Sequence, residues 1–185
     1  MVIGAVIVTY NPKIADLEIL LNNASGQLVQ TVIVDNNSTN ITDIELFLQK
    51  YDSVKLIKLP VNEGIGKAQN IGITYLLENK NVEAVLLFDH DSHPSVSMIP
   101  ELVNGLEKLE QTHKKVGAVG PIFFDPRTQN NYPISVFKGF RLLKKFPVEN
   151  DNTPIPASFL ISLTISIRCL LSRSFLRNVI AITLA

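Results

Sequence analysis

The chain has 185 residues, of which 46% are hydrophobic and 18% are charged, and its formal net charge is zero. These values favour one globular domain with a sizeable core and exclude a disordered chain. They also argue against nucleic acid as the main partner, because phosphate binding needs a surplus of Lys and Arg. The single cysteine, Cys169, excludes an internal disulfide and a cysteine-based zinc cluster.

The first predicted elements are a strand, a helix and a second strand. The opening segment MVIGAVIVTYNP has neither a basic leader nor a cleavage site, so we interpret Val2–Val8 as a buried strand and not as a signal peptide. Together with the cysteine content, this favours a cytoplasmic protein. Apolar residues recur at helical spacing from Ile14 to Ala24, and TVIVDNNS (residues 31–38) predicts a strand that ends in turn residues.

Helices and strands continue to alternate up to residue 124. The predicted helices lie around residues 44–48, 68–76 and 99–109, and the predicted strands at 54–60, 83–89 and 116–124. Thr42 and Glu45 form a candidate capping pair for the first of these helices. The strand at 54–60 alternates between apolar and polar residues, which favours a position nearer an edge of the sheet.

This alternation predicts an α/β fold with a mostly parallel central sheet and helices on both faces. Ligands of such sheets bind beyond the carboxyl ends of the strands. Polar clusters follow the predicted strands at these positions: Thr9–Asn11, Asp35–Ser38, Asn62–Asn70 and Asp89–Asp91. We therefore expect these clusters to meet at one edge of the sheet.

The periodicity fades between Asp125 and Pro156, where several prolines and the basic patch FKGFRLLKKF occur. We interpret this stretch as a long loop or hairpin over the site, or as a mobile segment. The ASFLIS segment, residues 157–162, predicts one more strand.

Two aspartates one residue apart end the strand at 83–89. Asp89 and Asp91 would point the same way on an extended backbone, and both would then reach one divalent cation. Mg²⁺ takes one or two protein carboxylates and fills its octahedron with phosphate oxygens and water. The alternative is a solvated loop with incidental acids. His90 either contacts a substrate or faces the opposite side, and His93 is interpreted as structural.

The ends of the first two strands carry groups that suit a nucleobase. Thr9 and Asn11 offer a hydroxyl and an amide, Tyr10 can stack on a base, and Asp35 can accept the imide N–H of uracil or thymine. The alternatives are turn chemistry ahead of Pro12 and an Asx turn. The residues after Asp35 are turn formers: Asn36, Asn37 and Ser38.

The segment NEGIGKAQN, residues 62–70, resembles two glycine motifs and satisfies neither. A phosphate-binding P-loop fails at Val61 and Ala68, and a dinucleotide fingerprint fails at Gln69. What remains is a glycine turn that enters a helix, with Lys67 and Asn70 in its first turns. That geometry suits an anion such as a diphosphate.

Four blocks in this order and spacing resemble glycosyltransferase family 2, and its bacterial rhamnosyltransferase branch most: VIVTYNP, VIVDNNS, NEGIGKAQNIG and LLFDHDSHP. The resemblance covers Met1 to Ser162. It implies the GT-A fold, a nucleotide-sugar donor such as dTDP-rhamnose or a UDP-sugar, a saccharide or lipid-linked saccharide acceptor, and inversion at the anomeric carbon.

The resemblance also implies roles for individual residues. Asp89 and Asp91 would be the D-x-D pair that binds Mg²⁺ or Mn²⁺ on the diphosphate. The donor-binding residues would be Thr9, Tyr10, Asn11, Asp35, Asn36, Lys67, Asn70, Asp89 and His90. Residues 1–162 would form the nucleotide-sugar-binding domain, with an incomplete acceptor half.

Residues 163–185 depart from the family pattern. The family continues with an acidic base, whereas no Asp or Glu follows Asp151 in this sequence. The apolar and basic tail resembles a truncated or frameshifted end, so the catalytic base is unassigned. A second interpretation is an in-plane membrane helix at the inner face of the membrane, with its arginines toward headgroups. The apolar tail, Leu160–Ala185, is also a candidate surface for self-association.

Three functions remain in competition. The first is a working glycosyltransferase, and the second is an inert remnant that still binds nucleotide sugars. The third is a sugar-nucleotide nucleotidyltransferase, which ranks low because TYNPKIADL has no glycine-rich basic loop after the first strand. Donor binding is common to the first two, and sugar transfer separates them.

Overall fold

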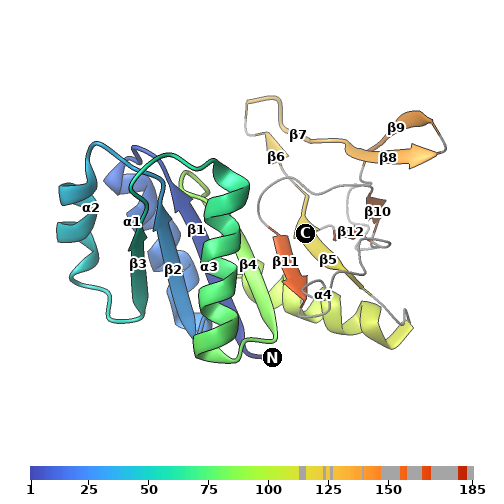
Figure 1. The fold of residues 1–185 in the computed structure, drawn as a ribbon. Coiled ribbons are helices and arrows are strands. Elements are labelled where there is room, and N and C mark those ends of the chain that lie inside the picture. The colour runs from blue at the N-terminus through green and yellow to red at the C-terminus, as the bar shows by residue number, and fades with distance from the viewer. Residues whose placement is uncertain are drawn as a thin grey trace. The chain divides into compact units, whose positions relative to one another are not determined.

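The computed structural model describes residues 1–112, 116–122, 124–125, 127–138, 140–146, 155–157, 164–167 and 179–182. The chain forms two compact units, Met1–Val96 and Ser97–Ala185 (Figure 1). The division falls within the predicted domain 1–162. The predicted boundary at residue 162 lies outside the described residues.

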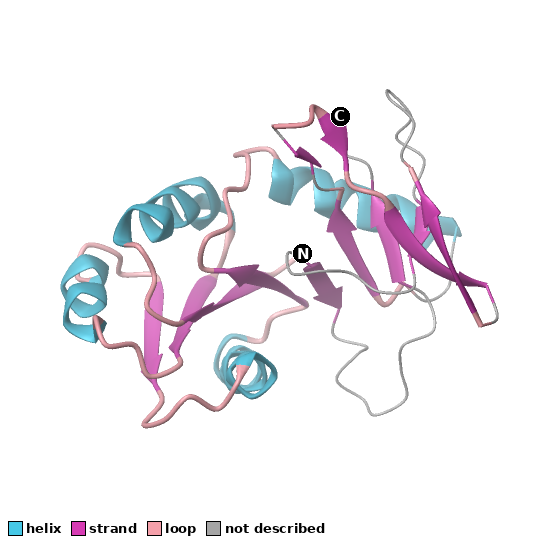
Figure 2. Ribbon diagram, turned by 90° about the horizontal axis from the view of Figure 1, so that it is seen from above, coloured by secondary structure: helices cyan, strands magenta, loops and turns pink. Residues whose placement is uncertain are grey.

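The first unit is a parallel sheet with helices on both faces (Figure 2). Its strands lie in the order β4-β1-β2-β3. The elements are β1 (Ile3–Thr9), α1 (Ile14–Ala24), the 3₁₀ helix η1 (Ser25–Gln27), β2 (Gln30–Asp35), α2 (Ile41–Leu48), β3 (Val54–Lys58), α3 (Ile65–Lys80) and β4 (Ala84–Asp89). The predicted α/β fold class is confirmed, and β3 takes the predicted edge position of this unit.

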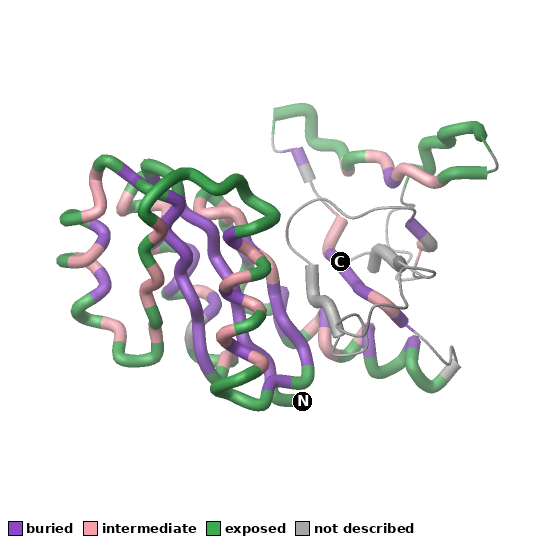
Figure 3. Tube along the Cα trace, viewed as in Figure 1, coloured by how far each residue is buried: buried purple, intermediate pink, exposed green. Residues whose placement is uncertain are grey.

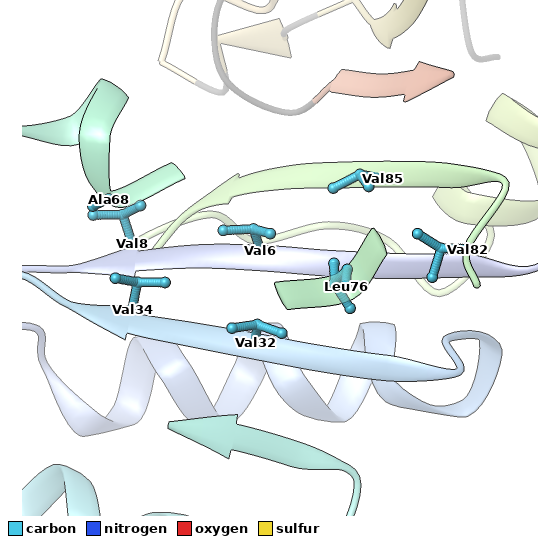
Figure 4. Packing of buried hydrophobic residues seen from close by; sticks show 8 residues of the cluster. All are labelled: Val6, Val8, Val32, Val34, Ala68, Leu76, Val82 and Val85. Carbon is cyan, nitrogen blue, oxygen red and sulfur yellow. The ribbon is translucent and has the colours of Figure 1, made fainter. Parts of the chain in front are cut away.

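The apolar runs become the buried strands of the first unit (Figure 3). Every residue of β1 and β2 is buried, as expected for strands covered on both faces. Alternate valines of these strands face α3, where Ala68 and Leu76 complete the cluster (Figure 4). Gly72, one turn before Leu76, is also buried on this face of α3. This packing fixes the helix whose first turn is part of the candidate site.

The predicted capping pair of α2 is wrong. The helix begins at Ile41 with Asn40 as its N-cap, so Thr42 already lies inside the first turn. Asn40 makes no side-chain capping bond, and its amide nitrogen instead donates to the carbonyl of Pro12 at 2.9 Å. The side chain therefore joins two loops at the same edge of the sheet.

The second unit contains one helix and short strands among its described residues. Its elements are α4 (Met98–Thr112), β5 (Ala118–Pro121), β6 (Phe124–Asp125), β7 (Asn130–Asn131), β8 (Ile134–Lys138), β9 (Arg141–Lys145), β10 (Ile155–Ala157), β11 (Thr164–Ile167) and β12 (Val179–Ile182). Strands β10, β12, β5 and β11 pair in this order, and β6–β7 and β8–β9 form antiparallel hairpins.

The structure tests two sequence predictions for this unit. The basic patch belongs to the β8–β9 hairpin, so a hairpin was the right alternative there, and its position over the site stays a prediction. The described parts of the tail are strands that pair with β5, not parts of a helix. Arg168, Arg173 and Arg177, the three arginines of the proposed in-plane helix, lie outside the described residues. No helix of the described part of the chain is long and apolar enough to cross a membrane.

Candidate functional site

The carboxyl ends of three neighbouring strands bring the predicted site residues together. Thr9 at the end of β1 is in register with Asp35 at the end of β2. On the other side of β1, Val8 is in register with Asp89 at the end of β4. Adjacent strands lie about 4.8 Å apart, so Asp35 and Asp89 are separated by roughly 10 Å. A ligand that contacts both must be longer than a metal ion or a single phosphate.

A buried hydrogen-bond cluster joins the ends of β1 and β2. The Thr9 hydroxyl donates to Oδ1 of Asp35 at 2.9 Å, and both residues are almost fully buried. The Ser38 hydroxyl also donates to Oδ1, while the Ser38 backbone N–H donates to Oδ2 at 2.9 Å. A carboxylate that receives these donors compensates for its burial. In this structure the Asp35 side chain holds two strand ends together, and a direct contact with a base remains a prediction.

Asn11 ties the loop after β1 to the loop after β2. It adopts a left-handed backbone conformation, with φ of 50°, which Asn tolerates better than most residues. Its N–H donates to the Ser38 hydroxyl at 2.8 Å, and its side-chain oxygen accepts from the N–H and hydroxyl of Thr39. These bonds occupy the amide oxygen that was predicted to meet a base.

Asn36 ties the same region to the loop that enters α3. Its amide nitrogen donates to Oδ1 of Asn62 at 2.9 Å, and its Oδ1 accepts the backbone N–H of Glu63 at 2.8 Å. Asn62 also accepts the N–H of Gly64, the N-cap of α3, at 3.0 Å. The predicted donor residue Asn36 therefore positions the helix entrance. Its partner Asn62 was not singled out in the sequence, although the NEG tripeptide is typical of an Asx turn.

The anion-binding candidates of α3 lie in solvent. The ammonium of Lys67 contacts the Glu63 carboxylate at 2.7 Å, and its side chain is largely exposed. Asn70 is exposed one turn further along the helix. Exposed pairs of this kind contribute little to stability, so a more highly charged anion can compete for Lys67. The pairing with Glu63 follows from the spacing of four residues, a signal already present in the sequence.

Tyr10 is an aromatic side chain at this edge that is 50% exposed. It follows the last residue of β1, whereas its neighbour Thr9 is buried. A ring in this position keeps a face open to a ligand, as the predicted stacking on a base requires. Of the residues predicted to contact the base, Tyr10 is thus one that can do so without breaking a hydrogen bond.

Asp89 and Asp91 do not lie on the extended backbone that their predicted geometry assumed, and their role as metal ligands stays a prediction. Strand β4 ends at Asp89, and the Ser92 N–H donates to the Asp89 carbonyl at 3.1 Å, so His90 and Asp91 lie in a turn and not on an extended backbone. Asp89 and His90 are half-buried and Asp91 is exposed. Neither carboxylate accepts a hydrogen bond or forms an ion pair with another described residue. Two such oxygen donors beside a turn suit Mg²⁺ or Mn²⁺.

His93 and the segment after the aspartates are fastened to α1. The His93 Nε2 lies 3.1 Å from Oδ1 of Asp16, in the first turn of α1. The amide nitrogen of Asn23 donates to the carbonyl of Pro94 at 2.9 Å. These contacts agree with the structural role predicted for His93. They hold the chain just beyond the Asp89–Ser92 turn.

The fold with these polar strand ends is the α/β GT-A fold of glycosyltransferases. Staphylococcus aureus TarS residues 1–349 match 94% of this chain and 49% of that chain, with a TM-score of 0.61 and 18% identity. Mannosyltransferase PcManGT from Pyrobaculum calidifontis, solved in complex with GDP-Man and Mn²⁺, matches 68% and 36%, with a TM-score of 0.51 and 24% identity. A 4-diphosphocytidyl-2C-methyl-D-erythritol synthase from Anaerococcus prevotii covers 91% and 71%, with a TM-score of 0.52 and 15% identity. At these identities the likeness concerns the fold alone.

Sequence comparison identifies the family. The profile of glycosyl transferase family 2 matches residues 5–170. The chain is 39% identical over 160 residues to the dTDP-rhamnosyl transferase RfbF of Shigella flexneri. This alignment covers 86% of the chain and 51% of the relative, so the chain spans about half the length of the curated relative that it matches. The chain belongs to glycosyltransferase family 2 and is similar to a rhamnosyltransferase, as its four sequence blocks predicted.

Proposed function

We propose that this chain is the donor-binding part of an inverting glycosyltransferase that transfers rhamnose from a nucleotide sugar to a saccharide or lipid-linked saccharide in bacterial polysaccharide synthesis. The observation that carries the proposal is the register of the strand ends, with Asp35 and Asp89 on either side of β1. Their separation of roughly 10 Å leaves room along this edge for a ligand with a base near the end of β2, which Asp35 holds in place, and a diphosphate near Asp89. The similarity to a dTDP-rhamnosyl transferase supports dTDP-rhamnose as the donor, with a UDP-sugar as the alternative.

The residues divide into those that touch the donor and those that shape its site. Tyr10 stacks on the base, and Lys67 and Asn70 face the diphosphate. Asp89 and Asp91 would hold a divalent cation that neutralises the diphosphate, with His90 beside them in the sequence. The hydrogen bonds of the remaining predicted residues keep the loops in place: Thr9, Asn11, Asp35 and Asn36. Such positioning matters because a displaced binding loop weakens every contact made from it.

The transfer is a single displacement. An acceptor hydroxyl attacks the anomeric carbon, the nucleoside diphosphate leaves, and the configuration at that carbon is inverted. A divalent cation held by Asp89 and Asp91 would neutralise the charge that gathers on the leaving group. Lys67 offers a further positive charge from the first turn of α3, where the helix dipole also favours an anion. A carboxylate base takes the proton of the acceptor hydroxyl.

The second candidate function is an inert nucleotide-sugar-binding remnant. Both functions need the donor site, whereas only the glycosyltransferase also needs that base, and no residue of this chain is assigned to that role. The third candidate, a nucleotidyltransferase, shares its fold with the Anaerococcus prevotii synthase. It still lacks a glycine-rich basic loop after β1, where the chain reads TYNPKIADL. We therefore rank the glycosyltransferase first and the remnant second, and we propose a cytoplasmic location for either.

Calorimetric titration with dTDP, UDP and GDP tests the donor site, each with Mn²⁺ and with EDTA. We expect dTDP or UDP to bind more tightly with Mn²⁺, and the Asp89→Ala/Asp91→Ala double variant to lose this dependence. Asp43→Ala/Asp52→Ala removes two exposed carboxylates elsewhere in the first unit and should retain it. Unchanged metal-dependent affinity in the Asp89/Asp91 double variant would refute the metal site. A lack of nucleotide binding under both conditions would refute the proposed function.

A further inference from the structure

The β8–β9 hairpin carries an unusual combination of charge and exposed apolar surface. We call its described part, residues 134–138 and 140–146, the basic hairpin. Four of these residues are cationic and none is acidic: Lys138, Arg141, Lys144 and Lys145. No Asp or Glu occurs anywhere between Asp125 and Glu149, in a chain whose formal net charge is zero. The basic hairpin is therefore a local concentration of positive charge.

The strand register shows which side chains share a face of the basic hairpin. Val136 is paired with Leu143, and Phe137 is paired with Leu142. Since side chains alternate along a strand, these two pairs lie on opposite faces. Val136 shares its face with Ile134, which packs in a small core with Ala157 and Ile122. This face is the side by which the hairpin is anchored to its own unit.

The opposite face and the tip expose apolar side chains. Phe137 is 55% exposed, and Leu142, opposite it, is 50% exposed. Phe140 at the tip is 107% exposed, and Phe146 at the end is 67% exposed. Large aromatic side chains left this far in water indicate a surface that another phase or molecule covers.

We infer that the basic hairpin docks on an anionic phospholipid bilayer. Cationic residues beside the apolar tip match the negative surface of such a membrane, and Phe140 can enter the interface between headgroups and acyl chains. Lys and Arg side chains next to an inserted ring keep their charge in the headgroup layer while their stems stay in apolar surroundings. A soluble acidic partner would satisfy the charges but would leave the ring at the tip without an apolar environment. The inference stands apart from the donor site and does not depend on it.

Vesicle co-sedimentation of the full chain tests the inference. The probes are vesicles of phosphatidylcholine alone and vesicles with about 30% phosphatidylglycerol, a content that gives a clearly negative surface. We expect binding to the anionic vesicles that weakens with added salt, and little binding to the neutral ones. Equal binding to both, or no binding to either, would overturn the inference.

Two variants separate the apolar and the charged contributions. Phe140→Ser removes an inserted ring and should weaken partitioning by roughly ten- to a hundredfold. The triple variant Lys138→Gln, Arg141→Gln and Lys144→Gln should weaken it by about a hundredfold, at roughly fivefold per charge. Because all four side chains are exposed, we expect both variants to fold and to bind dTDP as the wild type does.

A matched triple variant removes the same charge elsewhere: Lys55→Gln, Lys80→Gln and Lys108→Gln, all at exposed positions. We expect it to bind anionic vesicles within about threefold of the wild type, because these lysines are not part of the basic hairpin. An equal loss in both triple variants would overturn the inference by showing a general charge effect. The chain could also sediment without vesicles. If Phe140→Ser abolished that sedimentation, the inference would be overturned, since the hairpin would then join copies of the chain.

Discussion

Replacement of Gly72 by alanine tests how closely α3 must approach the sheet. A Cβ atom at this position would lie 2.5 Å from Cγ1 and 2.9 Å from Cγ2 of Val6, and 3.2 Å from Cγ2 of Val34. Val6 and Val34 are fully buried, and β-branched side chains have little freedom at χ1. The helix must therefore move away from the sheet to admit the methyl group.

The magnitude follows from the cost of overpacking a core, about 1–3 kcal/mol for a site that cannot relax freely. Gly66→Ala in the same helix is the matched control, since its Cβ would meet no atom within 4 Å. Alanine there should stabilise the protein by roughly 0.5–1 kcal/mol, because glycine loses more conformational freedom in a helix. This gain is common to both variants and cancels in their comparison, so they should differ by about 1–3 kcal/mol, with Gly72→Ala the less stable.

Urea titration followed by circular dichroism measures this difference as a change in the unfolding midpoint at constant slope. Gly72→Ala should also weaken nucleotide binding, because a displaced α3 moves Lys67 and Asn70. If Gly72→Ala proves as stable as Gly66→Ala, the close packing of α3 on Val6 is refuted.

Three further predictions concern buried polar groups and turnover. Thr9→Val removes the hydroxyl that donates to the buried Asp35 carboxylate and should cost about 1.5–3 kcal/mol by urea titration. Thr9→Ser should cost less, and a valine variant as stable as wild type would contradict this role of the bond. The Arg127 backbone N–H, at 2.9 Å, holds the pKa of Asp125 below its usual value of 3.8. This contribution to stability is present above about pH 4 and is lost as the pH falls through the lowered pKa. Asp125→Asn should therefore flatten the fall of the thermal midpoint below about pH 4, whereas parallel curves would show that Asp125 contributes nothing. Because a base contributes about a hundred- to ten-thousand-fold and no residue of this chain is assigned to that role, we expect weak or absent sugar transfer from dTDP-rhamnose by residues 1–185 alone, measured as released dTDP. Robust turnover would show that Asp151 or an acid before it acts as the base.

The sequence predicted the alternation of strands and helices along the chain, and the polar residues at the strand ends, better than the roles of single residues. Apolar runs such as Ile3–Thr9 predict buried parallel strands because burial on both faces leaves no alternation. The meeting of the polar clusters then follows, because the carboxyl ends of parallel strands lie at the same edge of the sheet. The close approach at Gly72 was not predicted, because it depends on a neighbour far away in the sequence.

The sequence also could not predict which residues of different loops are hydrogen-bonded to one another. The sequence marks Asn36 as a turn former or a ligand contact, and only the fold shows that it holds Asn62 and Glu63. Likewise, Asp89 and Asp91 were expected on an extended backbone, whereas the turn closed by Ser92 begins within the motif. A spacing of two residues cannot reveal where a strand ends, because the same letters fit the last residues of a strand and the first of a turn.

The central claim is that a nucleotide and a metal ion bind together at the carboxyl edge of the sheet in the first unit. Paramagnetic broadening of amide NMR signals by Mn²⁺, with and without dTDP, measures this directly. Strand β1 spans roughly 20 Å, so the amino and carboxyl ends of the strands are well separated. We predict that Mn²⁺ with dTDP broadens signals of residues 9–11, 35–38, 62–70 and 88–92, and spares those at the amino ends of the strands. Broadening at the amino ends, or broadening that is the same without dTDP, would contradict the account.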